Sequence, residues 1–358
     1  MRIGYLIDLH VGGRNPPVPT PALAYATMEA LIEEGIIAEE AGFHSLQIPE
    51  RHGLTQCFFP GPVQLLSILA HETRRVALGT FSCVLTLHNP MQLAEELAVV
   101  DNLSQGRLYS TVSRGFRPSY WDQFGIPQEK LLGRFKEALE IWELAFQGER
   151  FDFAGEHFHV RQGLLTPQPY QDGGWPIWGG GHRTPAAIRR SAAYGAAWTC
   201  DQYPLDPPVW HERRTLYNDY AAELGKRPFV VLMRDAWVED TMEDALAVFG
   251  EHLAGDLRWV FDQGLLEHPE FMSIADITPE AVARHAIVGD PDTCMEELVR
   301  YHEEFGVDYF ALRLRLATGP SLADVREQIR KFGELVVRPL HARYAAPDHP
   351  ALPAACRV

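Results

Sequence analysis

Short apolar runs alternate with longer amphipathic segments along almost the whole chain. A short apolar run is typical of a buried strand, whereas a longer segment with apolar residues three or four positions apart is typical of a helix. The strand-like runs are Ile3–Leu9, Ser45–Pro49, Val76–Leu85, Arg107–Val112, Pro176–Trp178, Ala196–Cys200, Phe229–Val238 and Val307–Leu316. The helix-like segments are Pro21–Ala41, Val63–His71, Pro90–Leu103, Pro127–Phe146, Thr184–Tyr194, Pro208–Leu224, Met242–Phe261, Pro291–Phe305 and Leu322–Leu340.

About eight units of strand and helix therefore follow one another, which predicts an α/β fold with a parallel sheet. The sheet could be open and doubly wound, but the count of eight favours a closed (β/α)8 TIM barrel. Phe151–Val160 alternates in polarity and predicts an inserted hairpin, and Asp262–Ala286 is a longer insertion that we expect to cover the active face as a lid. We expect one barrel domain over residues 1–344 and a disordered tail, rich in Ala and Pro, over residues 345–358.

Composition is that of an ordinary globular enzyme, with 46% hydrophobic and 22% charged residues. The net charge of −16 argues against nucleic acid and anionic membrane surfaces as partners, and it makes single arginines candidate sites for an anionic ligand. The five cysteines lack the CxxC spacing of a zinc site and do not form an even disulfide framework, so a reducing cytoplasm is expected. The first apolar run is interrupted by Asp8 and His10 and is interpreted as a strand, not a signal peptide.

In a barrel, functional residues gather where strands end, and four predicted strand ends carry unusual residues. The first is IPERHG, in which Glu50, Arg51 and His52 directly follow a strand. A carboxylate, a guanidinium and an imidazole placed together could orient a substrate and move a proton. An ordinary surface ion pair explains the same spacing equally well.

The second strand end is GTFSCVLTLHNP, Gly79 to Pro90, which contains no ionisable group before His88. Small and apolar residues of this kind indicate core packing, although they would also suit a flat apolar ring. The third is Ser113, Arg114 and Gly115, where the arginine fork could hold phosphate oxygens or could pair with a carboxylate of the barrel.

The fourth strand end is WPIWGGGHRTP, Trp175 to Pro185, where three glycines precede a predicted helix with Thr184 as its N-cap. Free amides at a helix N-terminus bind anions, so we predict an anion site here in preference to a glycine turn without a ligand. No metal site is predicted, because His157 and His159 share one strand face without an evident third ligand.

The run AEELAVVDNLSQGRLYSTVSRGFRPSYWDQFG, Ala94 to Gly125, resembles the bacterial luciferase-like flavin-dependent monooxygenases. In that family a helix ending in D-x-(L/M)-S-x-G-R leads into a strand, then an Arg-Gly pair and a short loop to Phe-Gly. The corresponding residues are Asp101, Leu103, Ser104, Gly106, Arg107, Arg114, Gly115, Phe124 and Gly125. The resemblance continues in order over nearly the whole chain, up to about Ala345.

The resemblance implies a barrel that binds reduced FMN at the C-terminal ends of its strands, with Arg114 on the flavin phosphate. It implies a non-proline cis peptide at Phe81–Ser82 behind the flavin ring. The implied cofactor-binding residues are Phe81, Ser82, Ser113, Arg114, Gly115, Phe116, Gly180, Gly181, His182, Arg183 and Thr184. The chain departs from bacterial luciferase itself at two positions, since Arg51 replaces the first of two adjacent histidines and Ser113 replaces a reactive cysteine.

The implied activity is that of a two-component monooxygenase, to which a separate NAD(P)H flavin reductase delivers reduced FMN and in which O2 is the co-substrate. The substrate would be a small, apolar organic molecule, oxygenated by hydroxylation or Baeyer–Villiger insertion. We expect His52 to act as acid and base, assisted by Glu50, and Arg51 to orient the substrate. Trp121, Trp178 and Trp198 are predicted to line its pocket, although aromatic residues of this kind also suit a core.

A homodimer is the family expectation for the assembled protein. A deazaflavin-dependent hydride-transfer enzyme on the same barrel is the first alternative. A non-catalytic flavin-binding subunit of a heterodimer is the second.

Overall fold

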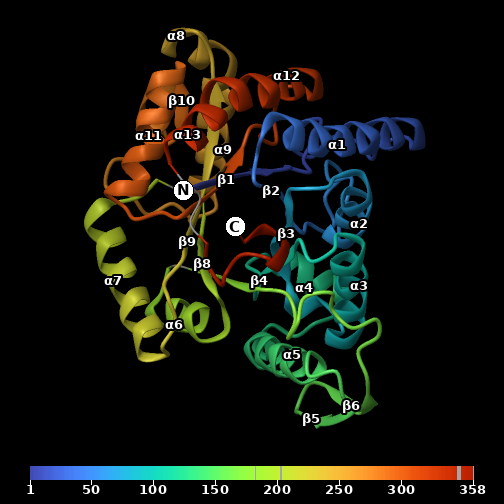
Figure 1. Ribbon diagram of the computed structural model, residues 1–358. Helices are drawn as coiled ribbons and strands as arrows, with labels where there is room; N and C mark the ends of the chain where they lie inside the picture. Colours follow the sequence, from blue (N-terminus) through green and yellow to red (C-terminus); the bar gives the residue numbers. More distant parts are fainter. Residues whose placement is uncertain (182, 202–203, 345–347, 358) are drawn as a thin grey trace.

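The computed structural model describes residues 1–181, 183–201, 204–344 and 348–357. Eight strands within these ranges are joined side by side in parallel, and pairing of the first with the last closes them into a barrel. Helices surround the strands, and the C-terminus lies over the centre of the barrel (Figure 1). The barrel strands are β1 (Arg2–Leu6), β2 (Ser45–Ile48), β3 (Ala77–Val84), β4 (Leu108–Ser113), β7 (Ile177–Gly180), β8 (Ala197–Cys200), β9 (Val230–Val238) and β11 (Tyr309–Arg313).

Each of the eight predicted strand runs overlaps one barrel strand, so the predicted (β/α)8 fold is confirmed. Two of the outer helices are lengthened by a π-helical turn, at Leu246–Gly250 and Gly333–Val337. The helices are α1 (Pro21–Ala41), α2 (Pro62–Glu72), α3 (Pro90–Leu103), α4 (Pro118–Phe124), α5 (Leu131–Ala145), α6 (Pro185–Tyr194), α7 (Pro207–Glu223), α8 (Met242–Ala245), α9 (Glu251–Asp262), α10 (Pro279–Ala283), α11 (Pro291–Glu303), α12 (Leu322–Phe332) and α13 (Arg338–Arg343). None of these helices is long and apolar enough to cross a bilayer.

Helix ends follow the capping residues that the sequence contains. Before α6, the Thr184 side chain accepts a hydrogen bond from the amide of Ala187 and Pro185 occupies the first turn, as predicted. At the far end of α1, Gly42 has a φ of +97°, a conformation that favours glycine, and it ends the helix. These local signals place the first turn of α6 directly after the end of β7.

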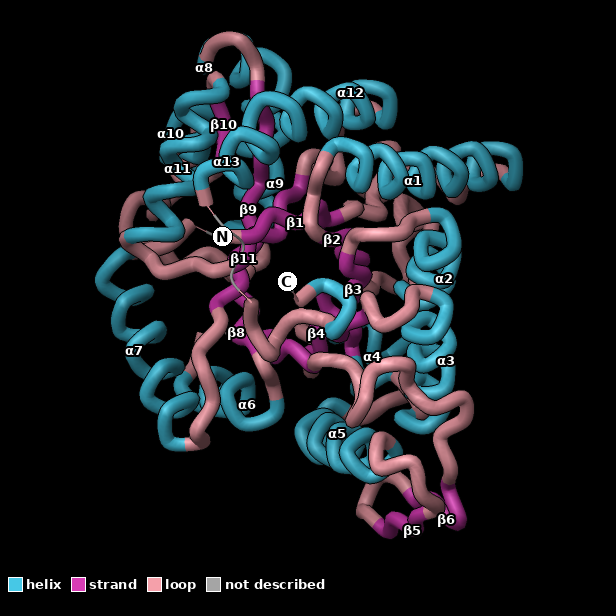
Figure 2. The backbone as a smooth tube through the Cα atoms, viewed as in Figure 1, coloured by secondary structure: helices cyan, strands magenta, loops and turns pink. Residues whose placement is uncertain are grey.

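Two insertions interrupt the regular alternation of strands and helices (Figure 2). The first is the predicted hairpin, formed by the antiparallel strands β5 (Phe151–Ala154) and β6 (His159–Gly163) next to α5. His157 lies in the turn between these strands, so it does not share a strand face with His159 as predicted. The second insertion contains α10 and leads into β10 (Ile287–Gly289), which pairs in parallel with β9. The strand β10 was not predicted, because three residues are too short for a recognisable pattern.

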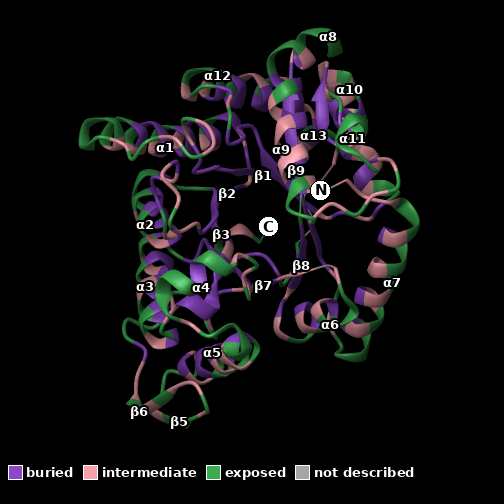
Figure 3. Ribbon diagram, turned by 180° about the vertical axis from the view of Figure 1, so that it is seen from behind, coloured by how far each residue is buried: buried purple, intermediate pink, exposed green. Residues whose placement is uncertain are grey.

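The N-terminal end of the barrel is filled by aromatic side chains and closed by the C-terminal tail. Ala351 and Leu352 are completely buried against this layer, and the indole of Trp178 donates a hydrogen bond of 2.7 Å to the carbonyl oxygen of Ala351. The prediction of a disordered tail is therefore wrong for residues 348–357, whereas 345–347 and 358 lie outside the described residues. The prediction rested on the Ala and Pro content of the tail and did not consider the few apolar side chains that the barrel buries. Figure 3 shows the buried strands inside the more exposed helices.

Candidate active site

A buried carboxylate holds two imidazoles at the C-terminal ends of β2 and β3. The Oε1 atom of Glu50 lies 2.7 Å from Nε2 of His52 and 2.7 Å from Nε2 of His88, while Oε2 accepts a hydrogen bond of 2.6 Å from the amide of Val84. Burial raises the pKa of Glu50, but these hydrogen bonds outweigh it and bring that pKa down to about 2. Glu50 is therefore ionised at neutral pH, and its charge fixes both rings.

This arrangement determines which ring nitrogen of each histidine remains free. Because Nε2 donates to the carboxylate, Nδ1 of a neutral His52 or His88 carries the lone pair. Burial lowers the pKa of His88, but the hydrogen bond and the charge of Glu50 outweigh burial, so the pKa of His88 is raised overall. The edge of the His52 ring also packs against Phe124, with ring centroids 4.8 Å apart. His52 can thus accept or return a proton through Nδ1 while Glu50 holds the ring.

His88 is a site residue that sequence reasoning missed. The stretch from Gly79 to Pro90 was interpreted as core, which is correct for Cys83 and Val84, both of which are buried. His88 follows a short 3-10 turn, Leu85–Leu87, after β3. Since β2 and β3 are paired neighbours, residues just after their ends meet, and this adjacency was the available signal.

A second charged cluster lies where β1, β9 and β11 end, and its residues were not predicted. The guanidinium of Arg313 bonds to three carboxylates, at 2.6 Å to Asp235, 2.9 Å to Asp256 and 3.4 Å to Asp8. Arg14 adds a bond of 2.7 Å to Asp256. Because these five residues come from separate parts of the chain, their pairing fixes the open end of the barrel without needing a ligand.

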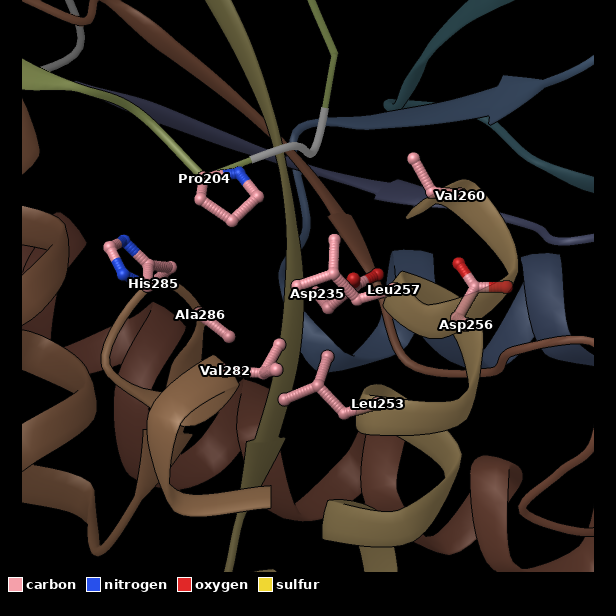
Figure 4. A pocket seen from close by; sticks show the side chains of 9 residues that line it. All are labelled: Pro204, Asp235, Leu253, Asp256, Leu257, Val260, Val282, His285 and Ala286. Atoms are coloured by element: carbon pink, nitrogen blue, oxygen red, sulfur yellow. The ribbon is translucent and has the colours of Figure 1, made fainter. Parts of the chain in front are cut away.

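A small pocket lies beside this cluster, between β9, α9 and α10 (Figure 4). The carboxylates of Asp235 and Asp256 and the ring of His285 are its polar groups, and aliphatic side chains form the rest of its wall. The insertion after α9 contributes part of that wall. The lining residues are Pro204, Asp235, Leu253, Asp256, Leu257, Val260, Val282, His285 and Ala286.

The ends of β3 and β4 form the opposite side of the barrel opening. The peptide bond between Phe81 and Ser82 is cis, which confirms the expectation for this position. The hydroxyl groups of Ser82 and Ser113 lie 2.8 Å apart, and Ser113 Oγ also accepts from the amide of Gly115 at 3.3 Å. These contacts join the two strand ends into one polar surface.

Arg114 extends from this surface toward α6. Its side chain is exposed, and no hydrogen bond or ion pair joins its guanidinium to another residue of the described chain. Burial lowers the pKa of Arg190 on α6, and the nearby charge of Arg114 lowers it further. The charges of Arg114 and of Arg190, which lies near the middle of α6, thus repel each other. An anion such as the phosphate of FMN fits this arrangement.

The glycine turn before α6 leaves little room for side chains. A Cβ on Gly180 would lie 3.2 Å from the carbonyl oxygen of Val112, and Gly181 has a φ of +135° that favours glycine. The side chain of Arg183 instead donates to the carbonyl oxygen of Leu265 in the insertion. His182, predicted to bind the cofactor, lies outside the described residues. The amide of Gly181 donates to the carbonyl oxygen of Thr199 at 3.5 Å, and the predicted role of the Arg183 side chain gains no support.

The three tryptophans predicted to line a substrate pocket have other positions. Trp178 is completely buried in the layer at the N-terminal end, stacked on Tyr109 with centroids 3.9 Å apart. Trp198 points outward from β8, between Trp210 and Tyr217 of α7. The predictions for Trp178 and Trp198 are wrong. Trp178 lies too deep in the barrel to reach the opening, and Trp198 lies on the face of β8 that points away from the barrel interior.

Trp121 is buried as well, but it lies beneath the strand ends. Its indole donates to the hydroxyl of Thr86 at 3.2 Å, and a Cβ on Gly115 would lie 3.2 Å from its ring. It therefore supports the loop that carries Arg114 instead of offering a free surface to substrate.

Two groups of described residues bring three potential metal-binding atoms within 4.8 Å of one another. In the first, Glu50 and His88 already bond to each other, and burial raises the pKa of the Cys83 thiol, which stays protonated. In the second, His268 uses Nδ1 to accept from the amide of Glu270, so its other nitrogen carries the proton. Hydrogen bonding accounts for both groups.

The chain is similar to one protein family and to several proteins of known activity. Residues 1–309 match the family model described as luciferase-like monooxygenase. The chain is 25% identical to the oxygenase component of flavin-dependent trigonelline monooxygenase from Acinetobacter baylyi, over 79% of this chain and 82% of that protein. It is 24% identical to an F420-dependent glucose-6-phosphate dehydrogenase from Rhodococcus hoagii, over 76% of this chain and 83% of that protein.

Other matches are shorter or rest on structure. The chain is 32% identical to protein y4wF of Sinorhizobium fredii, but the match covers 45% of this chain and only about half, 47%, of that relative. The monooxygenase RslO1 from Streptomyces bottropensis superposes with a TM-score of 0.82 at 23% identity, covering 95% of this chain and 100% of that chain. At this identity, the similarity to RslO1 supports the fold alone.

Proposed function

Because the chain belongs to the luciferase-like monooxygenase family, we propose that it is the oxygenase component of a two-component system that uses reduced FMN and O2. A separate NAD(P)H flavin reductase supplies the reduced FMN, and a small organic substrate is oxygenated by hydroxylation or Baeyer–Villiger insertion. The relative from Acinetobacter baylyi, itself named an oxygenase component, supports a reductase partner. We extend the proposal to a homodimer in the cytoplasm, and five free cysteines agree with a reducing compartment.

The observation that carries the proposal is the cationic site at Arg114. Its guanidinium has no bond within the described chain, and it lies close enough to Arg190 for their charges to interact. The Gly180 and Gly181 turn and the N-terminus of α6 complete a site for a terminal phosphate. The polar surface of Ser82 and Ser113 would then face the flavin ring.

Bound reduced FMN would supply the electrons and the position at which O2 is activated. His52 then moves the proton through Nδ1, and the ionised Glu50 stabilises the ring when it is protonated. His88 positions Glu50 from the other side. Arg51 orients the substrate, and the insertion between α9 and β10 restricts the entry of water to the open end.

Stopped-flow absorbance tests the proposed reaction. Anaerobic protein loaded with reduced FMN is mixed with oxygenated buffer, and the flavin spectrum is recorded until reoxidation is complete. We expect a transient species, distinct from reduced and oxidised FMN, that free flavin does not show. Reoxidation at the rate of free FMN, without such a species, would contradict the proposal.

Replacing Arg114 tests the phosphate site directly. Arg114→Ala should weaken the binding of reduced FMN by about 30-fold, since charge-assisted hydrogen bonds to the phosphate are lost. Anaerobic fluorescence titration measures the dissociation constant. Arg161→Ala, on the exposed hairpin strand β6, removes the same charge far from the strand ends and should leave it unchanged. An unchanged affinity in Arg114→Ala would disprove the phosphate assignment.

A deazaflavin-dependent hydride-transfer enzyme is the second candidate, because an F420-dependent dehydrogenase is among the relatives that match most of the chain. The two functions differ in their use of oxygen. Tight binding of reduced F420, without oxygen consumption in the presence of either cofactor, would favour this alternative over the FMN-dependent oxygenase.

A further inference from the structure

Arg51 is a half-buried cation at the open end of the barrel whose bonding capacity is not used. Its Nε atom is buried without a hydrogen-bond partner, and no ion pair joins its guanidinium to another residue of the described chain. A buried polar group without a partner destabilises the folded state, and a charged group does so more strongly. The Nε atom of Arg51 is therefore available to an acceptor from outside the chain.

The nearby carboxylates do not supply that acceptor. Asp8 accepts from the amide and from Nδ1 of His10, each at 3.0 Å, and from Arg313. Glu50 is bonded to two histidines and to a backbone amide. Burial raises the pKa of Asp8, but the charges of His10 and then Arg51 lower that pKa well below its usual value. Arg51 therefore lies near Asp8, although no direct bond joins the two side chains.

The surroundings of Arg51 are aromatic as well as cationic. Phe116 and Phe124 are large hydrophobic side chains that remain exposed, at 58% and 45%. The buried Tyr120 lies next to His52, with ring centroids 5.8 Å apart, and the charge of Arg51 helps to lower the pKa of Tyr120, which burial raises. Phe124 packs on His52 with ring centroids 4.8 Å apart, so an exposed aromatic side chain lies beside the proposed acid and base. The guanidinium of Arg117 lies 5.6 Å from the centre of the Phe116 ring, which adds a second cation to this aromatic group.

We infer that the substrate is an aromatic carboxylate, whose carboxylate group is bound by Arg51 and whose ring packs against Phe116 and Phe124. The planar fork of arginine matches the two oxygens of a carboxylate, and that bond would satisfy the buried Nε. The ring would then lie within reach of His52. This inference rests on the proposed function for the oxygenation step, and it makes the expected apolar substrate anionic at one end.

Binding of benzoate and of its neutral analogue benzamide tests the inference by isothermal titration calorimetry. The titrations use the full-length protein, both without flavin and after loading with FMN, at neutral pH. We expect benzoate to bind about tenfold or more tightly than benzamide, because only the carboxylate forms a charge-assisted pair with Arg51. Arg51→Gln should abolish this preference, and Arg51→Lys should retain part of it.

Arg258→Gln is the matched control, because it removes the same charge from α9, where Arg258 bonds to the carbonyl oxygen of Ile277 and to Glu251. That variant should keep the full preference for benzoate, and circular dichroism confirms that each variant is folded. Equal affinity for the two probes in the parent protein, or an undiminished preference in Arg51→Gln, overturns the inference. If benzoate binds through Arg51 while the protein fails to activate oxygen, the substrate class stands and the proposed function falls.

Discussion

The two ends of the barrel are built from the same strands but have opposite chemistry. At the N-terminal end, the ring of Trp178 stacks on that of Tyr109, and its centroid lies 5.3 Å from the ring centroid of Tyr309. At the C-terminal end, Arg313 bonds to three carboxylates and Glu50 to two histidines. One end is filled with aromatic rings and closed by the tail, whereas the other keeps charged groups that are not all paired.

Single strands show this division most clearly. The strand β4 carries Tyr109 near its start and Ser113 at its end, and β11 runs from Tyr309 to Arg313 in the same way. Both residues of each pair face the barrel interior, because they are an even number of positions apart. Depth along the strand, and not residue spacing, therefore separates the aromatic residues that fill the closed end from the polar and charged residues at the open end.

Removal of the central aromatic group should have the largest effect, and only on stability. Trp178→Ala should lower the free energy of unfolding by about 4 kcal/mol, because it leaves a cavity and an unpaired carbonyl oxygen at Ala351. Urea denaturation measures this loss. The dissociation constant of reduced FMN for the folded protein should change little.

Trp178→Phe, which retains most of the ring area, should lose much less stability than Trp178→Ala. A stable Trp178→Ala variant that no longer binds FMN would contradict the division between the two ends.

The opposite result is expected at the open end. His52→Gln should lower kcat by about 100-fold, since it removes the proton-transferring group, while the free energy of unfolding changes by less than about 1 kcal/mol. Steady-state turnover, with the substrate that a screen of aromatic carboxylates provides, measures the first quantity. His88→Gln, which alters only the positioning of Glu50, should reduce kcat less. If both variants lose equal activity, His52 has no special role.

The smallest expected effect is a pH dependence at the closed end. His349 is buried, its ring lies 4.6 Å from that of Phe229, and its Nδ1 accepts from the amide of Ala351 at 3.0 Å. Burial first, and the charge of Arg227 second, lower the pKa of His349 from 6.5 to about 4. The neutral ring therefore contributes stability that is present above pH 6.5 and is lost as the pH falls through about 4.

Between pH 7 and pH 5 this loss should amount to about 1 kcal/mol, after allowance for partial solvation. His349→Asn keeps an acceptor for the Ala351 amide but cannot titrate, so its unfolding free energy should fall less over that range. Urea denaturation of both proteins at the two pH values makes the comparison. Identical slopes would show that His349 does not carry the effect.

The sequence alone predicted the fold, and it also named candidate site residues at the strand ends, whose roles stay predictions. Glu50 and His52 were identified from their position after a strand, and Arg114 from its position before a glycine. The cis peptide at Phe81–Ser82 was expected from family resemblance. Local signals sufficed for these residues, because a strand end is marked by its own apolar run and its own flanking residues.

What the sequence determined is the order of eight strand and helix units, the ends of those units and therefore the barrel with its candidate site residues at one face. The tertiary structure alone decided which distant groups meet, such as His88 with Glu50, Asp8 with Arg313 and Ala351 with Trp178. It also decided that Trp178 and Trp198 belong to packing and not to a pocket. The physical reason is that periodicity fixes the face on which a side chain lies, whereas its partners depend on closure of the sheet. That closure brings together residues from 38 to 305 positions apart.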